Sequence, residues 1–274
     1  MTPTVPAPSK SVTTAREISV AQVTGRRWWR FLIGFAILWG VLAGLGEIDA
    51  TGRWGIPILV LVAATAVIVE KLLFKTSLRH AVGFLGLGRP GGRSLAVAAV
   101  VSGLVLLVYP ATIAVTGAQL RLVPNWPWIL VGIFAFHGLA EEIVWRSFAF
   151  RRLSIDRPFR TAVLWTMPLV AAAHTPVVVN NGFVIALGAM LVAAVTSLPF
   201  SYLYATGRCT IWAPALVHTA IDTFKLVIIP EAAVTTFSML LIAVSIAIPL
   251  LALAVPRRLM LPGVSALDNE RRLP

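Results

Sequence analysis

The sequence predicts an all-α fold, a polytopic membrane helix bundle with about eight transmembrane helices. Hydrophobic residues make up 58% of the 274 residues and charged residues only 12%, with a mean hydropathy of +0.87. Soluble domains contain about a quarter charged residues, so this composition excludes a soluble enzyme, a fibrous protein and a disordered regulator. The apolar residues also fall into runs of roughly 20, the length that an α-helix needs to cross a bilayer.

Eight apolar runs have the length and composition of spanning helices. The first follows a basic, aromatic membrane edge at 26–30, and no small-residue cleavage site follows it, so we interpret it as an uncleaved anchor. Residues 1–24, rich in Pro, Ser and Thr, predict a disordered cytoplasmic tail. Residues 25–256 form the predicted transmembrane domain, and 257–274 a second cytoplasmic tail. The expected spans are 30–48, 54–74, 94–117, 126–150, 160–180, 183–206, 210–229 and 234–255.

The distribution of basic residues supports this number of spans, because basic side chains gather on the cytoplasmic side of a membrane protein. With eight spans, 19 of the 23 lysines and arginines lie on one side. Only Arg53, Arg121 and Lys225 lie on the other, and Arg146 is inside a span. Both termini are therefore expected in the cytoplasm, in a multi-pass protein of the plasma membrane. Topology accounts for the net charge of +12, so nucleic acid is not an expected partner.

Two other sequence features carry no function. Cys209 is the only cysteine, which excludes an intrachain disulfide and a cysteine-based metal cluster. The string at 86–91 has the form G-x-G-x-x-G, but a dinucleotide site requires a strand before it and a helix after it. Here it lies between two predicted membrane helices and contains Pro90, so we interpret it as a turn-rich loop.

Ionisable residues inside three of the predicted spans mark a candidate site. A polar group at this depth is costly unless it is paired, so each is a functional-site hypothesis. A lone histidine in a span is more often a packing residue that hydrogen-bonds to a neighbouring helix. The whole set, at broadly similar depth, would be expensive to bury without a function. Its members are Glu141, Glu142, Arg146, His174, His218 and Asp222.

Spacing within the spans distinguishes these groups. Glu142 and Arg146 are four residues apart, acid before base, and are expected to pair on one helical turn. Glu141 lies about 100° round the helix, without that partner, and is free for proton chemistry. In the seventh span Asp222 follows His218 by four residues, so its carboxylate can orient or charge the imidazole.

These motifs resemble those of the CPBP family of intramembrane proteases, which includes type 2 CAAX prenyl endopeptidases and bacteriocin-processing and self-immunity proteins. The resemblance covers a motif-bearing core at about 125–225. The motif E-E-x-x-x-R is present at 141–146. F-x-x-x-H is met only at His174, because Val170 stands where the family has Phe. H-x-x-x-N/D is met by His218 and Asp222.

The resemblance implies hydrolysis of a peptide bond in a membrane-embedded peptide or lipidated protein. By analogy Glu141 activates water with help from His174. His218 and Asp222 stabilise the oxyanion or position the water, and the Glu142–Arg146 pair fixes the helix. Two histidines and a glutamate are also a plausible set for a divalent metal such as zinc, with His174 and His218 as ligands. However, H-E-x-x-H is absent, and a metal-free Glu–His mechanism is equally open.

Two other classes of function compete with a protease. One is a non-catalytic membrane scaffold that retains the protease motifs and binds a membrane-protein partner. The other is a proton-coupled transporter, which usually shows paired halves with matching interrupted helices; no such halves are found. His137, one turn before Glu141, is expected to tolerate alanine with activity within a few-fold.

Overall fold

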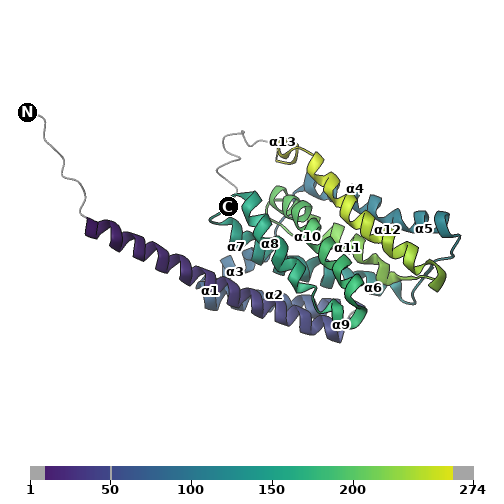
Figure 1. The fold of residues 1–274 in the computed structure, drawn as a ribbon, viewed down its shortest axis with the longest axis horizontal. Coiled ribbons are helices and arrows are strands. Elements are labelled where there is room, and N and C mark those ends of the chain that lie inside the picture. Colours follow the sequence, from purple (N-terminus) through teal and green to yellow (C-terminus); the bar gives the residue numbers. More distant parts are fainter. Residues whose placement is uncertain (1–9, 50, 262–274) are drawn as a thin grey trace, which may run out of the picture.

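The computed structural model describes residues 10–49 and 51–261, and within them the chain is almost entirely helical (Figure 1). The predicted all-α class is confirmed. The first half contains α1 (Lys10–Ile48), α2 (Gly55–Phe74), α3 (Leu78–Phe84), α4 (Gly92–Leu106), α5 (Val108–Thr116), strand β1 (Arg121–Leu122) and α6 (Trp126–Ile133). Next come the π-helices η1 (Phe134–Ala140) and η2 (Ile143–Phe150), then α7 (Arg151–Ser154), α8 (Phe159–Ala173), α9 (Val177–Asn181) and α10 (Phe183–Thr206). The chain continues with α11 (Trp212–Asp222), the 3-10 helix η3 (Thr223–Leu226), strand β2 (Val227–Ile228), α12 (Glu231–Leu250), the 3-10 helix η4 (Leu251–Ala254) and α13 (Arg257–Met260).

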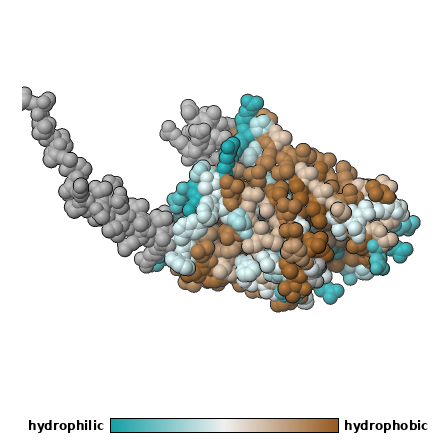
Figure 2. All heavy atoms as spheres, in the orientation of Figure 1, coloured by the Kyte–Doolittle hydropathy of each residue, from teal (hydrophilic) through white to brown (hydrophobic). Residues whose placement is uncertain are grey.

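Seven helical segments of the described chain are long and apolar enough to cross a membrane, which makes this a multi-pass membrane protein. Figure 2 shows hydrophobic residues over most of the visible face and hydrophilic residues gathered toward its ends. The segments agree with seven of the eight predicted spans. They are Trp28–Ile48, Gly55–Phe74, Gly92–Thr116, Trp126–Ser154, Phe159–Val179, Phe183–Thr206 and Glu231–Ala254.

The span predicted at 210–229 is wrong in length. Helix α11 has 11 residues and η3 has four, which together reach about 24 Å. Its short length is tolerated because α11 lies inside the bundle, in contact with α4, η1 and α10 (Figure 1). An inner helix is surrounded by protein rather than lipid. The unpaired backbone N–H and C=O groups at its ends can therefore hydrogen-bond to neighbouring protein segments, and the helix need not span the whole bilayer.

The chain nevertheless crosses the bundle at α11, because its two ends lie at opposite ends of the molecule. Just before α11, the Ile211 backbone N–H donates to the Gly86 carbonyl at 3.0 Å. Just after η3, strand β2 pairs antiparallel with β1. Gly86 and β1 lie on opposite sides of the α4–α5 crossing, so α11 supplies the eighth passage through the bundle.

Loops that were predicted to share a side of the membrane meet in the structure. At the basic end, Arg151 Nη1 donates to the Gly83 carbonyl at 3.4 Å, and Arg93 Nη1 to the Leu259 carbonyl at 2.6 Å. At the other end, the Trp128 indole donates to the Arg53 carbonyl at 3.2 Å. The alternation of the chain therefore agrees with the sequence-based topology. The assignment of the basic end to the cytoplasm stays a prediction from charge.

The two predicted tails fall largely outside the described residues, which exclude 1–9 and 262–274. Helix α1 begins at Lys10, so residues 10–24 of the predicted disordered tail are helical in the structure. The prolines that motivated that prediction, Pro3, Pro6 and Pro8, all precede Lys10. The domain boundaries themselves stay predictions.

Prolines break two of the predicted spans. The span at 94–117 divides at Leu107 into α4 and α5, because Pro110 cannot donate the helical hydrogen bond to the carbonyl four residues earlier. In the span at 160–180, helix α8 ends at Ala173. His174 follows directly, and Pro176 lies two residues after His174. Pro168, by contrast, lies inside α8. His174 therefore caps the end of a helix at a break in the span.

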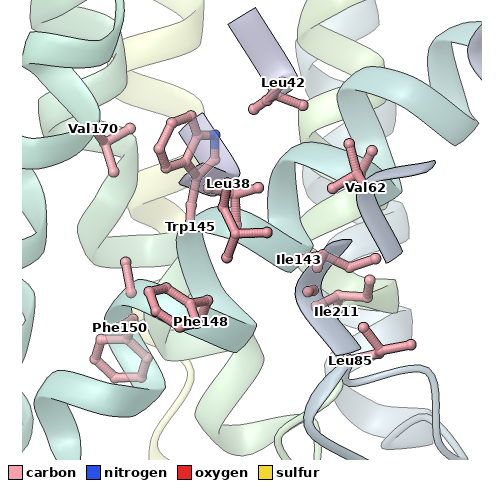
Figure 3. Packing of buried hydrophobic residues seen from close by; sticks show 14 of the residues in the cluster. Leu38, Leu42, Val62, Leu85, Ile143, Trp145, Phe148, Phe150, Val170 and Ile211 are labelled. Carbon is pink, nitrogen blue, oxygen red and sulfur yellow. The ribbon is translucent and has the colours of Figure 1, made fainter. Parts of the chain in front are cut away.

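The largest apolar core holds the glutamate-bearing helix in place. Trp145 and Phe148 of η2 are buried in one cluster with Leu38 of α1 and Val170 of α8. Figure 3 shows these side chains converging on η2. Val170 is 3% exposed, so the smaller residue at the family's Phe position is fully buried. This packing fixes one face of the helix that carries Glu141 and Glu142.

Asp49 organises the turn between α1 and α2. It is 6% exposed, and its carboxylate accepts hydrogen bonds from the backbone N–H groups of Thr51 (3.0 Å), Gly52 (3.1 Å) and Trp54 (2.6 Å). The Thr51 hydroxyl donates a further bond at 2.7 Å. Burial alone would raise the pKa of Asp49, but these hydrogen bonds outweigh it and lower the pKa below its ordinary value.

Replacing Asp49 by Asn is expected to lower the free energy of unfolding by about 1–3 kcal/mol at neutral pH, because donors in the buried turn lose their charged acceptor. A carboxyl whose pKa is depressed on folding stabilises the protein above its unfolded pKa, and that stabilisation is lost as pH falls through the folded pKa. The difference from wild type should therefore shrink below about pH 4. Thermal unfolding of both proteins in detergent, at pH 7 and at pH 3, measures it. An equal difference at both pH values would contradict the assignment.

Candidate active site

The two adjacent glutamates lie in the middle of one continuous helical segment, Trp126–Ser154. π-Helical turns stand on both sides of them, η1 before Glu141 and η2 after Glu142. Such wide turns are rare and are frequently found at functional sites. The sequence pattern gave no signal of them, because the apolar spacing of the span also fits an ordinary α-helix.

Glu142 and Arg146 form the predicted pair. Arg146 Nη1 donates to Glu142 Oε1 at 3.2 Å, and the two side chains are 2% and 0% exposed. The guanidinium also lies 5.0 Å from the centroid of the Phe200 ring. A fully enclosed ion pair of this kind has no access to a substrate. It is therefore suited to fixing the helix rather than to chemistry.

Glu141 is more accessible and is held by its own helix. Its side chain is 13% exposed. One carboxylate oxygen, Oε1, lies 2.7 Å from His137 Nδ1, and the other, Oε2, accepts a hydrogen bond from the Trp145 indole at 3.3 Å. Both partners are four residues away on the same helix. The carboxylate is thus oriented from both sides, and it is the better placed of the two glutamates for proton transfer.

His218 joins the two glutamates to helix α11. Its Nδ1 lies 2.9 Å from Glu142 Oε1, and because Glu142 is ion-paired as a carboxylate, Nδ1 carries the proton and donates. Its Nε2 lies 3.7 Å from Glu141 Oε2 and 3.7 Å from Asp222 Oδ2. These separations are too long for direct hydrogen bonds, and a bound water or a substrate oxygen can bridge them.

Gly138 of η1 allows α11 to lie close to the helix that carries Glu141 and Glu142. A Cβ atom at Gly138 would lie 2.5 Å from the Thr219 hydroxyl oxygen and 3.1 Å from the Ala215 carbonyl oxygen of α11. A side chain at this position would require the Thr219 hydroxyl and the backbone of α11 to shift, and α11 carries His218. Gly138 is therefore part of the site's geometry, which the sequence alone did not indicate.

His174 lies at the C-terminal end of α8, with one nitrogen engaged. Its Nδ1 lies 2.8 Å from the Val170 carbonyl oxygen, so Nδ1 carries the proton and Nε2 is left as an acceptor. Within the described chain, no hydrogen bond joins His174 to the other predicted site residues.

The site contains two residues whose role the sequence reasoning missed. His137 was expected to be peripheral, yet its Nδ1 bonds Glu141, lies 3.7 Å from Asp222 Oδ2, and is 7% exposed as a residue. Lys225 falls near the end of the span predicted at 210–229 and counts there with the basic residues of the outer side, yet its Nζ lies 2.6 Å from His137 Nε2. The i, i+4 spacing of His137 and Glu141 was the available signal for the first. Nothing in the sequence indicated the second.

The charges of this cluster nearly balance. The cluster contains three carboxylates, those of Glu141, Glu142 and Asp222, and two basic side chains, Arg146 and Lys225. With the imidazoles of His137, His174 and His218 all neutral, one negative charge remains, and a single imidazolium compensates it. The cluster can therefore hold and release one proton inside the membrane at small electrostatic cost, as acid–base chemistry requires.

The residues do not fit a metal centre as they are arranged. A zinc site needs three or four ligand atoms that converge on one point at about 2.0–2.3 Å from the ion. Among residues 10–49 and 51–261, no group of three or more His, Cys, Asp or Glu is arranged to hold a metal ion. In the two predicted ligands, His174 and His218, Nδ1 is engaged with the Val170 carbonyl and with Glu142, so only their Nε2 atoms are open to an ion. We therefore derive no step through a metal.

The fold and this cluster define a class of protein: a multi-pass helical membrane protein with a candidate acid–base site built inside the bundle. Residues 123–224 match the family model described as Type II CAAX prenyl endopeptidase Rce1-like. The match includes all six residues predicted for the site, and it confirms the resemblance to this protease family. No curated protein and no solved structure matches the chain.

Proposed function

We propose that the protein is an intramembrane endopeptidase of the plasma membrane that hydrolyses a peptide bond in a membrane-associated or lipidated peptide or protein. The observation that carries this proposal is the environment of Glu141. Its carboxylate is partly accessible, is oriented by His137 and Trp145, and faces His218 across 3.7 Å. The Rce1-like family match, which describes proteases of prenylated CAAX substrates, supports the reaction type and the lipidated substrate.

In the first step of the proposed reaction, Glu141 accepts a proton from a water molecule placed between it and His218. The water oxygen forms a bond to the carbonyl carbon of the substrate, and the negative charge moves to the carbonyl oxygen. An N–H donor aimed at that oxygen stabilises the developing charge. We assign the oxyanion to His218, which donates from Nε2 as an imidazolium because its Nδ1 also carries a proton, and we assign the assistance of Glu141 to His174 from the resemblance to the family.

In the second step, the protonated Glu141 gives its proton to the amide nitrogen of the substrate, and the carbon–nitrogen bond breaks. The products are a carboxylic acid and an amine, and Glu141 returns to its carboxylate form, so one water is consumed and the proton balance closes. Glu142 and Arg146 take no part in these transfers. They hold His218, through the 2.9 Å contact, in line with Glu141.

The proposal is tested with purified protein reconstituted in liposomes and a farnesylated peptide that ends in a C-a-a-X sequence. We expect mass spectrometry to show release of the C-terminal tripeptide by wild type and none by Glu141→Gln. A parallel sample dialysed against a chelator tests whether cleavage requires a metal ion, and we expect this sample to retain activity. Loss of activity that zinc restores would overturn the metal-free mechanism, and the absence of cleavage by wild type would favour the scaffold function.

His137→Ala is expected to lower the cleavage rate by at least about tenfold, because Glu141 loses the hydrogen bond that orients it. This revises the sequence-based expectation of an effect within a few-fold, since the structure places His137 Nδ1 in direct contact with Glu141. The peptide assay in liposomes measures the rate. His80→Ala is a matched control, because His80 is exposed on α3 and its ring contacts Ser77 rather than a residue of the site. Equal rates for the two variants would contradict the role of His137.

A further inference from the structure

We propose that Lys225 is a positioning residue that holds His137 in one tautomer, with its proton on Nδ1 and directed at Glu141. The inference rests on the proposed proteolytic function for its effect on rate, but its structural content can be measured without any substrate. It concerns a hydrogen-bonded chain from Lys225 Nζ through His137 to Glu141, built from contacts of 2.6 Å and 2.7 Å.

The contacts of the imidazole determine its tautomer. On one side, His137 Nδ1 faces two carboxylates, Glu141 at 2.7 Å and Asp222 at 3.7 Å. Carboxylates only accept hydrogen bonds, so Nδ1 must carry the proton. On the other side, Nε2 lies 2.6 Å from the Lys225 ammonium, which only donates. Nε2 is therefore the bare acceptor, and His137 is neutral.

Without the Lys225 ammonium, nothing would keep His137 in the neutral tautomer with its proton on Nδ1. In the described part of the chain, the carboxylates paired with His137 are Glu141 on its own helix and Asp222 on α11, and both attract a second proton to the ring. A doubly protonated His137 would form an ion pair with Glu141 and weaken it as a base. Lys225 prevents this, because a cation at Nε2 opposes a second positive charge on the ring.

The backbone around Lys225 is fixed, as a positioning role requires. Lys225 lies in η3, directly after α11 and directly before β2, which pairs with β1. Two residues earlier, the Thr223 hydroxyl lies 2.8 Å from the Tyr109 hydroxyl of α5. Lys225 is thus held in η3 by the strand pairing on one side and by the Thr223–Tyr109 contact on the other, which places its ammonium at His137.

The structural test is ¹⁵N NMR of histidine-labelled protein in nanodiscs, with the His137 signals assigned by their loss in His137→Gln. The chain has four histidines, so this subtraction is practical. We expect wild type to show one protonated and one unprotonated nitrogen for His137, with the proton on Nδ1. In Lys225→Met, which keeps the aliphatic stem, we expect mixed tautomers or double protonation. An unchanged His137 spectrum in Lys225→Met would overturn the proposal.

The functional test is a double-mutant cycle in the farnesylated-peptide assay. Lys225→Met is expected to lower kcat at least about tenfold, to shift the pH–rate profile, and to be partly rescued by Lys225→Arg. In the His137→Gln background the same change should alter the rate by no more than about twofold, because the two residues act through one chain. Lys71→Met, an exposed lysine of α2, is the matched control.

The outcomes separate this inference from the proposed function. The positioning role would be overturned, even if wild type is a protease, if the rate losses of Lys225→Met and His137→Gln multiplied in the double variant. It would also be overturned if Lys225→Arg were as impaired as Lys225→Met. Absence of cleavage by wild type would instead remove the proposed function, and the NMR comparison would still decide whether Lys225 fixes the His137 tautomer.

Discussion

Replacing Glu141 by Gln is expected to lower the rate of peptide cleavage by about 10²–10⁴-fold, the usual contribution of a general base. Glutamine has the shape of glutamate, so its carbonyl oxygen can still accept from the Trp145 indole. It cannot take a proton from water, and its amide nitrogen cannot accept from His137. The loss should therefore appear in kcat rather than in KM or in the amount of folded protein. Rates of tripeptide release in liposomes, at matched protein density, measure it.

Glu231→Gln is the matched control for this experiment, because Glu231 is exposed at the start of α12, outside the site. It makes the same chemical change and should leave the rate within about twofold, the range of a surface substitution. A Glu141→Gln variant that cleaves as fast as Glu231→Gln would remove Glu141 from the reaction, and with it the proposed mechanism.

Replacing Glu142 by Gln is expected to have the second largest effect, on stability as well as activity. The change leaves the buried Arg146 guanidinium without its counter-charge. Breaking a buried ion pair in this way costs about 3–5 kcal/mol of the free energy of unfolding. It also weakens the anchor of His218, so cleavage should fall as well. Equilibrium unfolding in bicelles measures the first effect, and the peptide assay the second.

A double variant distinguishes charge from packing at this pair. In Glu142→Gln with Arg146→Met no charge remains buried, so we expect the double variant to be more stable than Glu142→Gln alone. Its activity should stay low, because His218 still lacks the carboxylate at Nδ1. A Glu142→Gln variant as stable as wild type would show that the pair is not a determinant of the fold.

The topology of the chain was largely predictable from the sequence, for a physical reason. Spanning helices must be about 20 apolar residues long, and basic residues collect on one side, so length and charge together fix the crossings. The contacts of Arg151 with Gly83 and of Trp128 with Arg53 agree with that alternation. The length rule failed at α11 because it describes helices that face lipid, whereas α11 is enclosed by other helices.

The candidate site was predictable only in its local part. The pair Glu142–Arg146 follows from helical spacing within one segment, and the structure contains it. No comparable spacing rule predicts which residues of different segments come into contact. Lys225 and His137 are 88 positions apart, and their contact depends on where α11 ends and on the close approach that Gly138 permits. Single-sequence periodicity carries no information about either.

The most direct test of the central claim, that this protein is a protease whose base is Glu141, is quantitative peptidomics of cells. Cells carrying wild type are compared with cells carrying Glu141→Gln at the same membrane level. We expect a defined set of cleaved ends to appear with wild type and to vanish with the variant, and those ends identify the substrate. Identical peptide profiles, with Glu141→Gln still rescuing the phenotype of a deletion strain, would contradict the claim and leave a non-catalytic membrane scaffold as the function.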